Sequence, residues 1–377
     1  MNSDTNTTTS SLLRVLTPGT QCPSCSSPQN RATPIATFTD TTEATADMMI
    51  LAPDREGSAG GKQKPDRFKR AKATKPDVYE IVTERILSLL EQGTAPWLSS
   101  SIARVGIPRN FLTQKHYSGI NVFLLGSAEF QSPYFLTYRQ AQELGGQVRK
   151  GEKGLPIIKM GTWQKKSDND TSSASSSKSD DDKKTREARF LKLYTVFNAC
   201  QIDGIAFPEP PKCPSFTESD MGAQARSITE QMPNPPIIHV GRKAYPHYIP
   251  DDDTVHMPTR ESFRSEYRFH KTLFHELAHA TGHPTRLNRT TLVENRGMYA
   301  VGEDKKIYCL EELTAEMAAA FLATHAEIVE DDLQQSAAYL KGWLDVLRVP
   351  DHKNWLIKAA SEAQKAADYI LGEERNF

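Results

Sequence analysis

Two histidines and a glutamate form the group of side chains best placed to do chemistry. His275, Glu276 and His279 lie in a run from residue 267 to 283. On an α-helix, His275 and His279 are one turn apart, so both imidazoles can reach a single metal ion. Glu276 follows the first histidine, where its carboxylate can accept a proton from an attacking water. The spacing therefore predicts metal-assisted hydrolysis.

The neighbouring residues predict the helix that this chemistry requires. Side chains that recur at spacings of three and four form a largely apolar stripe facing the core: Tyr267, His270, Phe274, Leu277 and Thr281. Gly282 and Pro284 end the helix just after the second histidine. An HExxH pattern on such a helix is typical of zinc metallopeptidases. The alternative is an amphipathic helix that carries two surface histidines.

A third ligand distinguishes these interpretations, because a catalytic zinc takes three protein ligands and keeps one position open. His283 is close in sequence, but it lies eight residues after His275, about 80° around a helix axis. Gly282 and Pro284 also interrupt the helix there. Thr285 occupies the position where a longer histidine pattern would place its third ligand.

A pair of carboxylates further along the chain is the better candidate. Glu312 and Glu316 are four residues apart, so they share one face of the helix predicted for residues 310–324. The pair resembles the glutamate zincins, and that resemblance implies that Glu312 is the third ligand and that Glu316 hydrogen-bonds a ligand histidine. Glu311 would point about 100° away. Glu316 and His283 stay as alternative ligands.

The composition of that second helix supports a metal. Leu313, Met317 and Phe321 make it largely apolar, and a buried carboxylate without a partner is costly. We therefore predict one Zn²⁺ ion, with another divalent metal as the alternative.

Composition excludes several other classes of protein. The chain has 377 residues and a net charge of -1, so any nucleic-acid surface must be local. No apolar run approaches the roughly 18 residues of a membrane span. The first residues lack the basic and apolar regions of a secretory signal. Five cysteines, an odd and sparse set, fit a reducing compartment. We predict a cytoplasmic protein with no membrane partner.

Shifts in composition predict the domain organisation. Residues 1–74 are rich in Thr, Ser, Pro and Gly and are expected to form a disordered N-terminal extension. Residues 75–207 form a first domain, in which the Ser-, Asp- and Lys-rich stretch 165–189 is a flexible loop between two strands. The proline-rich residues 208–215 form a linker to a second domain, 216–377.

Short motifs with a fixed order extend over both predicted domains. They include Gly-Thr-Ala-Pro-Trp at 93–97, Tyr-Ser-Gly-Ile-Asn at 117–121 and Val-Arg-Lys-Gly-Glu-Lys-Gly at 148–154, with further motifs at 79–86, 108–110, 132–138, 140–141, 144–146 and 194–198. In these motifs the chain resembles the ArdC-type antirestriction proteins, from about residue 77 to its end.

The resemblance implies an α+β protein of two domains. The first is a mixed α/β domain that binds single-stranded DNA, and the second is a zincin-like metallopeptidase domain with a small sheet and several helices. It also implies that the protein protects transferred plasmid or phage DNA.

Basic and aromatic side chains of the first domain are the candidates for DNA contacts. Proteins that bind single strands combine a basic groove with aromatic platforms on which bases stack. The candidates are Trp97, Arg109, Lys115, Tyr117, Arg139, Arg149, Lys150 and Lys153. For residues 149–154 the alternative is a solvated hairpin turn. The basic run 62–75 is either a solvated linker or an electrostatic arm for phosphates.

Two functions follow from these patterns. The first is an antirestriction-type protein that binds single-stranded DNA and carries a zinc metallopeptidase-like site, with a peptide or protein substrate such as a host defence protein as its second partner. The alternative is a DNA-binding, shielding protein whose metal site is structural or vestigial. Glu276 favours chemistry, because a structural site does not need a proton acceptor beside the metal.

Overall fold

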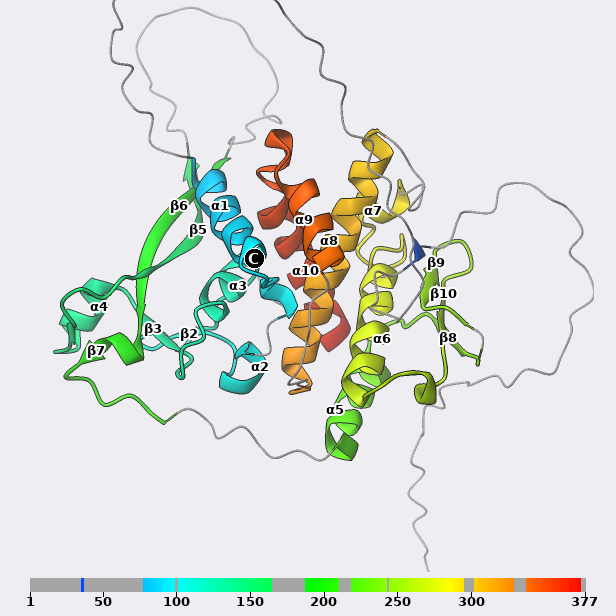
Figure 1. The fold of residues 1–377 in the computed structure, drawn as a ribbon, viewed down its shortest axis with the longest axis horizontal. Coiled ribbons are helices and arrows are strands. Elements are labelled where there is room, and N and C mark those ends of the chain that lie inside the picture. Colours follow the sequence, from blue (N-terminus) through cyan, green and yellow to red (C-terminus); the bar gives the residue numbers. More distant parts are fainter. Residues whose placement is uncertain are drawn as a thin grey trace, which may run out of the picture.

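The computed structural model describes residues 35–36, 77–98, 101–164, 187–209, 218–242, 244–294, 302–328 and 337–373. Two sheets flank a central group of helices, as Figure 1 shows. This mixture of helices and sheets confirms the predicted α+β class. None of the described helices has the length and apolar character needed to cross a bilayer.

Helix α1 (Val78–Glu91) begins the first predicted domain, where the sequence expects it. The Asp77 side chain accepts a hydrogen bond from Tyr79 N, and Asp77 N donates to the Glu80 carboxylate at 3.2 Å. These capping bonds satisfy amides that have no partner within the helix. The following helices are the 3₁₀ turn Pro96–Leu98, α2 (Ser101–Val105), α3 (Ile120–Gly126) and α4 (Tyr138–Glu143).

A four-stranded sheet supports this half of the chain. Its order is β2 (Arg109–Asn110), β3 (Tyr134–Leu136), β6 (Glu187–Asn198) and β5 (Leu155–Gln164). β4 (Gln147–Val148) and β7 (Ile202–Asp203) form a separate pair. The loop predicted for 165–189 is shorter at its C-terminal end, because residues 187–189 belong to β6 and pair with β5. The remainder of that predicted loop lies outside the described residues.

The second sheet precedes the HExxH helix. It contains β8 (Ile237–Val240), β9 (His247–Ile249) and β10 (Thr254–Met257), with β10 parallel to β8 and antiparallel to β9. β1 (Ile35–Ala36) pairs with β9. These two residues are the only part of the predicted extension before residue 75 that the structure describes, and they form a strand. The predicted disorder of the other residues lies outside the described residues.

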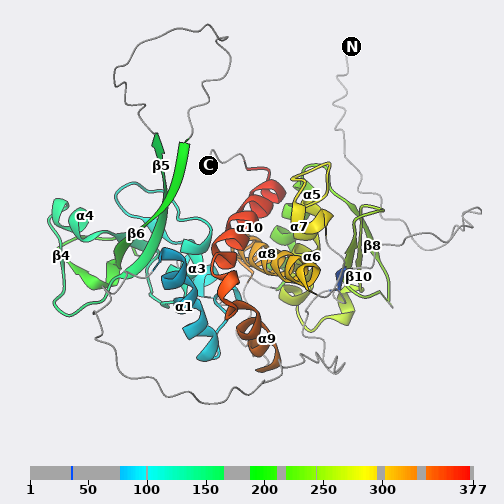
Figure 2. The ribbon, with the colours of Figure 1, turned by 90° about the horizontal axis from the view of Figure 1, so that it is seen from above.

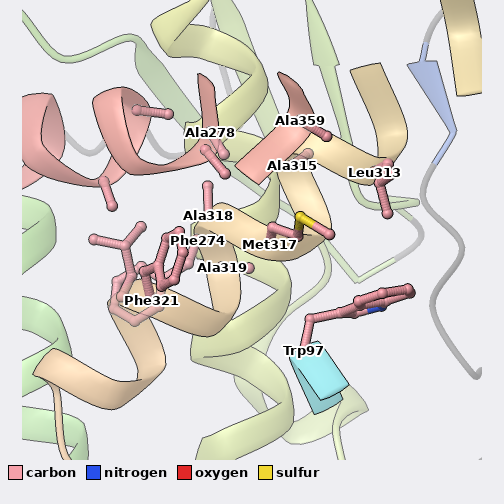
Figure 3. Close-up of a cluster of buried hydrophobic side chains, with 14 of the residues drawn as sticks. Trp97, Phe274, Ala278, Leu313, Ala315, Met317, Ala318, Ala319, Phe321 and Ala359 are labelled. Carbon is pink, nitrogen blue, oxygen red and sulfur yellow. The ribbon is translucent and has the colours of Figure 1, made fainter. Parts of the chain in front are cut away.

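Helices complete this half of the chain. α5 (Glu218–Gln231) precedes the second sheet, and the described α-helices after the sheet are α6 (Glu266–Thr281), α7 (Thr290–Val293), α8 (Glu303–His325), α9 (Ala337–Leu347) and α10 (Trp355–Leu371). α8 packs against both α6 and α10. Small side chains allow this close approach, and Figure 3 shows Ala278 of α6, Ala315 and Ala318 of α8 and Ala359 of α10 close together in the core.

The main hydrophobic core extends across the predicted domain boundary. The Phe123 ring of α3 stacks on the Phe321 ring of α8, with centroids 4.8 Å apart. Trp97 lies in the same core, and its indole nitrogen donates to the Tyr339 hydroxyl of α9 at 2.9 Å. The described parts of the two predicted domains therefore share one core. Residues from both domains pack in the core that contains α6 and α8.

We expect Phe123→Ala to destabilise the whole chain by roughly 3–5 kcal/mol, because it removes a buried ring and leaves a cavity in this shared core. Thermal unfolding should stay a single transition and move to lower temperature. Leu112→Ala is the control, since Leu112 is 46 % exposed and its loss should change stability by about 0.5 kcal/mol or less. Two separate transitions, with only one of them shifted, would show that the halves unfold independently.

Candidate metal centre

Three buried side chains from α6 and α8 converge on one point. His275 Nε2 and His279 Nε2 are 3.0 Å apart. The Glu312 carboxylate lies 3.5 Å from His275 Nε2 and 3.6 Å from His279 Nε2. One donor atom from each residue lies within 4.8 Å of the others. The structure thus brings together the three residues that were predicted as ligands.

The helix that carries the histidines is buried on all sides at its C-terminal end. Ser265 caps its start by accepting a hydrogen bond from Arg268 N at 3.2 Å. The stripe predicted to face the core is buried, and so is every residue from Thr272 to Thr281. The alternative of two surface histidines is therefore wrong, because His275 and His279 are 3 % and 0 % exposed.

The chemistry of these donors fits a divalent cation. His279 Nδ1 lies 3.1 Å from the ionised Glu311 carboxylate, so Nδ1 carries the proton and Nε2 keeps its lone pair. That lone pair points at His275 Nε2 and at the Glu312 carboxylate. Two imidazole nitrogens and a carboxylate that lie this close in a buried space would be stabilised together by a cation between them. Two imidazoles and a carboxylate suit zinc, manganese and similar ions.

Burial also dominates the electrostatics of Glu312. It raises the pKa of this carboxyl to about 8, with a lowering contribution from His279 and raising contributions from Glu316 and Glu311. Tyr308 lies one turn earlier on α8 and is buried as well. Burial first, and then the charge of Glu312, raise the pKa of the Tyr308 phenol, which therefore stays protonated. A bound cation would favour the ionised form of Glu312.

A buried ion pair holds His279 in place. Arg289 donates to both oxygens of Glu311, at 2.8 Å and 2.6 Å, and Thr291 donates to one of them at 2.5 Å. Although burial raises the pKa of Glu311, the Arg289 charge and hydrogen bonds lower it far below its usual range. Glu311 therefore stays ionised and fixes the tautomer and orientation of the His279 ring.

This geometry corrects the role given to Glu316. The carboxylate that hydrogen-bonds a ligand histidine belongs to Glu311, whereas a Glu316 oxygen lies 3.9 Å from Lys271 Nζ. The two ring nitrogens of His279 face different directions, so adjacent residues of α8 reach opposite sides of the ring. The 100° between Glu311 and Glu312, which argued against Glu311, is what lets both residues contact His279.

The other candidates near this centre are placed as follows. The Glu276 side chain is fully buried, directly after His275 on α6. His283 lies beyond the end of α6 and its Nδ1 is 2.8 Å from Thr285 Oγ1, so it is not a member of the ligand cluster. Arg289 was missed in the sequence. The signals that could have suggested it are two arginines, Arg286 and Arg289, close after the HExxH helix and an adjacent acidic pair on the next helix.

The predicted DNA contacts do not form one surface. Trp97 is 2 % exposed and belongs to the main core, so its indole is not accessible to a base and the assignment does not fit. Tyr117 is half-buried and packs edge-on against Phe135, with centroids 6.3 Å apart. The Arg109 guanidinium stacks 4.6 Å above the Tyr134 ring. Lys115 is exposed on the loop between β2 and α3.

The remaining basic candidates lie around β4. Arg139 is exposed and pairs with Glu143 at 2.8 Å. Arg149 is held by Glu152 at 2.9 Å and Asp203 at 3.3 Å. Lys150 and Lys153 are exposed beside it. A cavity of about 570 Å³ is lined by Arg149 and Lys150 together with Tyr138, Gln147, Val148, Glu152, Phe197 and Asp203. Of the two lysines, Lys150 therefore borders a hollow that also contains aromatic rings.

Comparison with known proteins agrees with this fold and site. Residues 225–362 match the family model of zincin-like metallopeptidases, and residues 76–197 match that of the N-terminal domain of anti-restriction factor ArdC. The fold and site thus define a zincin-like metallopeptidase domain joined to an ArdC-type N-terminal domain.

Solved structures and curated relatives identify the family. The chain is 34 % identical to the antirestriction protein ArdC of plasmid R388, in its metal-free and Mn(II)-bound structures. The TM-score is 0.57 for each, and the match covers 79 % and 80 % of this chain and 100 % and 99 % of the solved chains. This chain belongs to the ArdC family of antirestriction proteins.

Two curated relatives differ in how much of their length is matched. The chain is 31 % identical to the uncharacterized protein y4eC of Sinorhizobium fredii, over 81 % of this chain and 95 % of y4eC. It is 34 % identical to a DNA primase TraC of Escherichia coli over 81 % of this chain. That match covers only 28 % of the primase, so the chain spans about a quarter of its length.

We expect Glu311→Gln to weaken metal affinity by about 10- to 100-fold, because the charge that orients His279 is lost. Glu316→Gln is the matched control on the same helix and should leave affinity within about threefold. Metal competition with a chromogenic chelator measures both affinities. Melting of the metal-free variants should accompany it, since Glu311→Gln also leaves Arg289 without its counter-charge. A larger loss of metal affinity in Glu316→Gln than in Glu311→Gln would indicate that Glu316, not Glu311, orients the ligand histidine.

Proposed function

We propose that this protein binds single-stranded DNA and carries a metal-dependent peptidase centre, and that it protects transferred plasmid or phage DNA in the cytoplasm of the recipient cell. One observation carries the peptidase proposal: His275, His279 and Glu312 converge in a buried site, with Glu276 next to the first ligand. Membership of the ArdC family supports the role in antirestriction.

In this proposal each side chain of the centre has a separate task. His275, His279 and Glu312 hold the cation, and Glu311 with Arg289 fixes the His279 ring. When bound, a divalent cation polarises the peptide carbonyl and lowers the pKa of the attacking water. Glu276 accepts the proton of that water and returns it to the nitrogen of the leaving amine. Zinc is the metal we propose; the R388 relative has a Mn(II)-bound structure, and the same donors suit that ion.

The proposed partners are single-stranded DNA and a peptide or protein such as a host defence protein. The DNA proposal is supported by the ArdC-type match over residues 76–197 and by exposed cations, among them Lys115, Lys150 and Lys153. Phosphate neutralisation by such side chains gives binding without sequence preference.

A specific observation favours a second function, a shielding protein whose metal is structural. Glu276 and His279 are both 0 % exposed, and Glu312 is 2 % exposed. A catalytic metal needs a position that water and substrate can reach, whereas a structural one is closed. Removal of the proton acceptor separates the two functions, because only peptide hydrolysis requires it.

Glu276→Gln should keep the bound metal at the level of the wild-type chain and lower peptide hydrolysis by at least about 100-fold. Metal content by elemental analysis and cleavage of a quenched peptide library measure the two effects. Glu312→Gln is the contrasting variant, which should lose the metal as well. Protection of transferred DNA by Glu276→Gln at the wild-type level would favour the structural function.

Lys150→Gln combined with Lys153→Gln should reduce the salt dependence of binding to a labelled oligothymidine. For single strands the slope of log K against log salt is about -0.7 per phosphate contact, so two contacts account for a change of about 1.4. Fluorescence anisotropy at several salt concentrations measures the slope. An unchanged slope would identify residues 149–154 as a solvated turn.

A further inference from the structure

Strands β5 and β6 form a long ribbon that runs beside α1, as Figures 1 and 2 show. Ten residue pairs hold it in antiparallel register. Because side chains alternate between the two faces of a strand, the register determines which residues share a face. Ile158 packs against the main core, so its face is turned toward the helices.

On the opposite face, Ile157 and Val196 are buried against Leu125 and Phe135. The next part of this face, which we name the outer ribbon face, consists of Lys159, Gly161, Phe190, Lys192 and Tyr194. The pairs Lys159–Lys192 and Gly161–Phe190 lie directly opposite each other across the two strands. Both lysines are exposed, Phe190 is 48 % exposed and Tyr194 is 36 % exposed. Along β6 the order is therefore aromatic, cation, aromatic, with the two rings roughly 13 Å apart.

The two lysines place like charges at directly opposite positions of the two strands. Such a pair destabilises a sheet unless an anion neutralises it. Within the described residues neither lysine forms an ion pair, and the contact recorded for Lys192 is with the Tyr194 ring, whose centroid is 5.1 Å from Nζ. The charge on this face therefore suits an anionic partner.

Gly161 lets the Phe190 ring lie flat on the ribbon. A β-carbon at position 161 would be 2.5 Å from Phe190 Cζ and 2.9 Å from Cε2, so the ring covers the place where another side chain would stand. One ring face rests on the Gly161 backbone, and the ring remains about half exposed. This is the geometry of a stacking platform.

We propose that the outer ribbon face binds single-stranded DNA, with bases stacked on Phe190 and Tyr194 and phosphates neutralised by Lys159 and Lys192. This assignment rests on the proposed DNA-binding function. It places DNA binding at a site that the sequence motifs did not indicate. A duplex does not suit this face, because its bases are already stacked and present only their edges in the grooves. An unstacked strand offers base faces and phosphates alternately, as this face requires.

The test uses the full chain and a labelled oligothymidine. Phe190→Ala and Tyr194→Ala should each weaken binding by about 5- to 150-fold, the range for loss of one stacked base, with an unchanged salt slope. Lys159→Gln combined with Lys192→Gln should reduce the slope by about 1.4. Phe190→Trp should restore binding lost in Phe190→Ala.

Gly161→Ala provides a test that depends on the ring geometry alone. The added methyl group displaces the Phe190 ring and changes no charge, so affinity should fall about as much as in Phe190→Ala. Thermal melting of each variant excludes a general loss of folding as the cause.

Matched controls lie in the second half of the chain. Lys341→Gln with Lys358→Gln removes two exposed charges from α9 and α10, and Tyr245→Ala removes a ring that is 82 % exposed. These controls should bind as the wild-type chain does. Wild-type affinity and slope in all outer-face variants would overturn the site and leave the proposed DNA binding intact. Failure of the wild-type chain to bind any single strand would overturn both.

Discussion

The cost of burying charge in the contact between α6 and α8 is the constraint on which the centre depends. Glu311, Glu312 and Arg289 are nearly inaccessible to water, as are both ligand histidines. An isolated carboxylate in such surroundings would lose its charge or destabilise the fold. Glu311 avoids this because Arg289 and Thr291 satisfy its two oxygens. Among the described residues no arginine or lysine pairs with Glu312, and a divalent metal is the partner that its position accommodates.

Close helix packing makes this arrangement possible. Alanines at the crossing of α6, α8 and α10 allow the helix backbones to approach one another. The carboxylates of Glu311 and Glu312 on α8 can therefore reach the imidazoles on α6. The same core receives Phe123 and Trp97 from the first half of the chain. A change in the N-terminal region can therefore alter the position of α8 and with it Glu312. This shared core physically connects the ArdC-type N-terminal region with the helices of the metal centre.

The metal centre and the exposed basic surfaces of the first half of the chain differ in how far water screens their charges. The metal centre excludes water, so its few charges act strongly and have fixed partners. The outer ribbon face and the β4 region expose their cations to water, where each contact with a phosphate contributes little and salt screens it. Binding of a long polyanion by many weak contacts suits an exposed ribbon, whereas a buried site suits the tight binding of one small cation. In Figure 1 the β5–β6 ribbon lies on one side of the central helices, and the metal centre lies between two of those helices, α6 and α8.

Local patterns in the sequence determined the helices that carry the candidate metal-binding side chains. The HExxH pattern predicted that His275 and His279 share one face of a helix, and the acidic pair on the later helix included Glu312, which joins them. Each pattern depends on residues within one or two turns. Tertiary structure decided the rest. The choice of Glu311 over Glu316, the role of Arg289, the burial of Trp97 and the pairing of Lys159 with Lys192 all depend on neighbours that are distant in sequence. Helical periodicity gives a direction around one axis, but only packing decides which element lies in that direction.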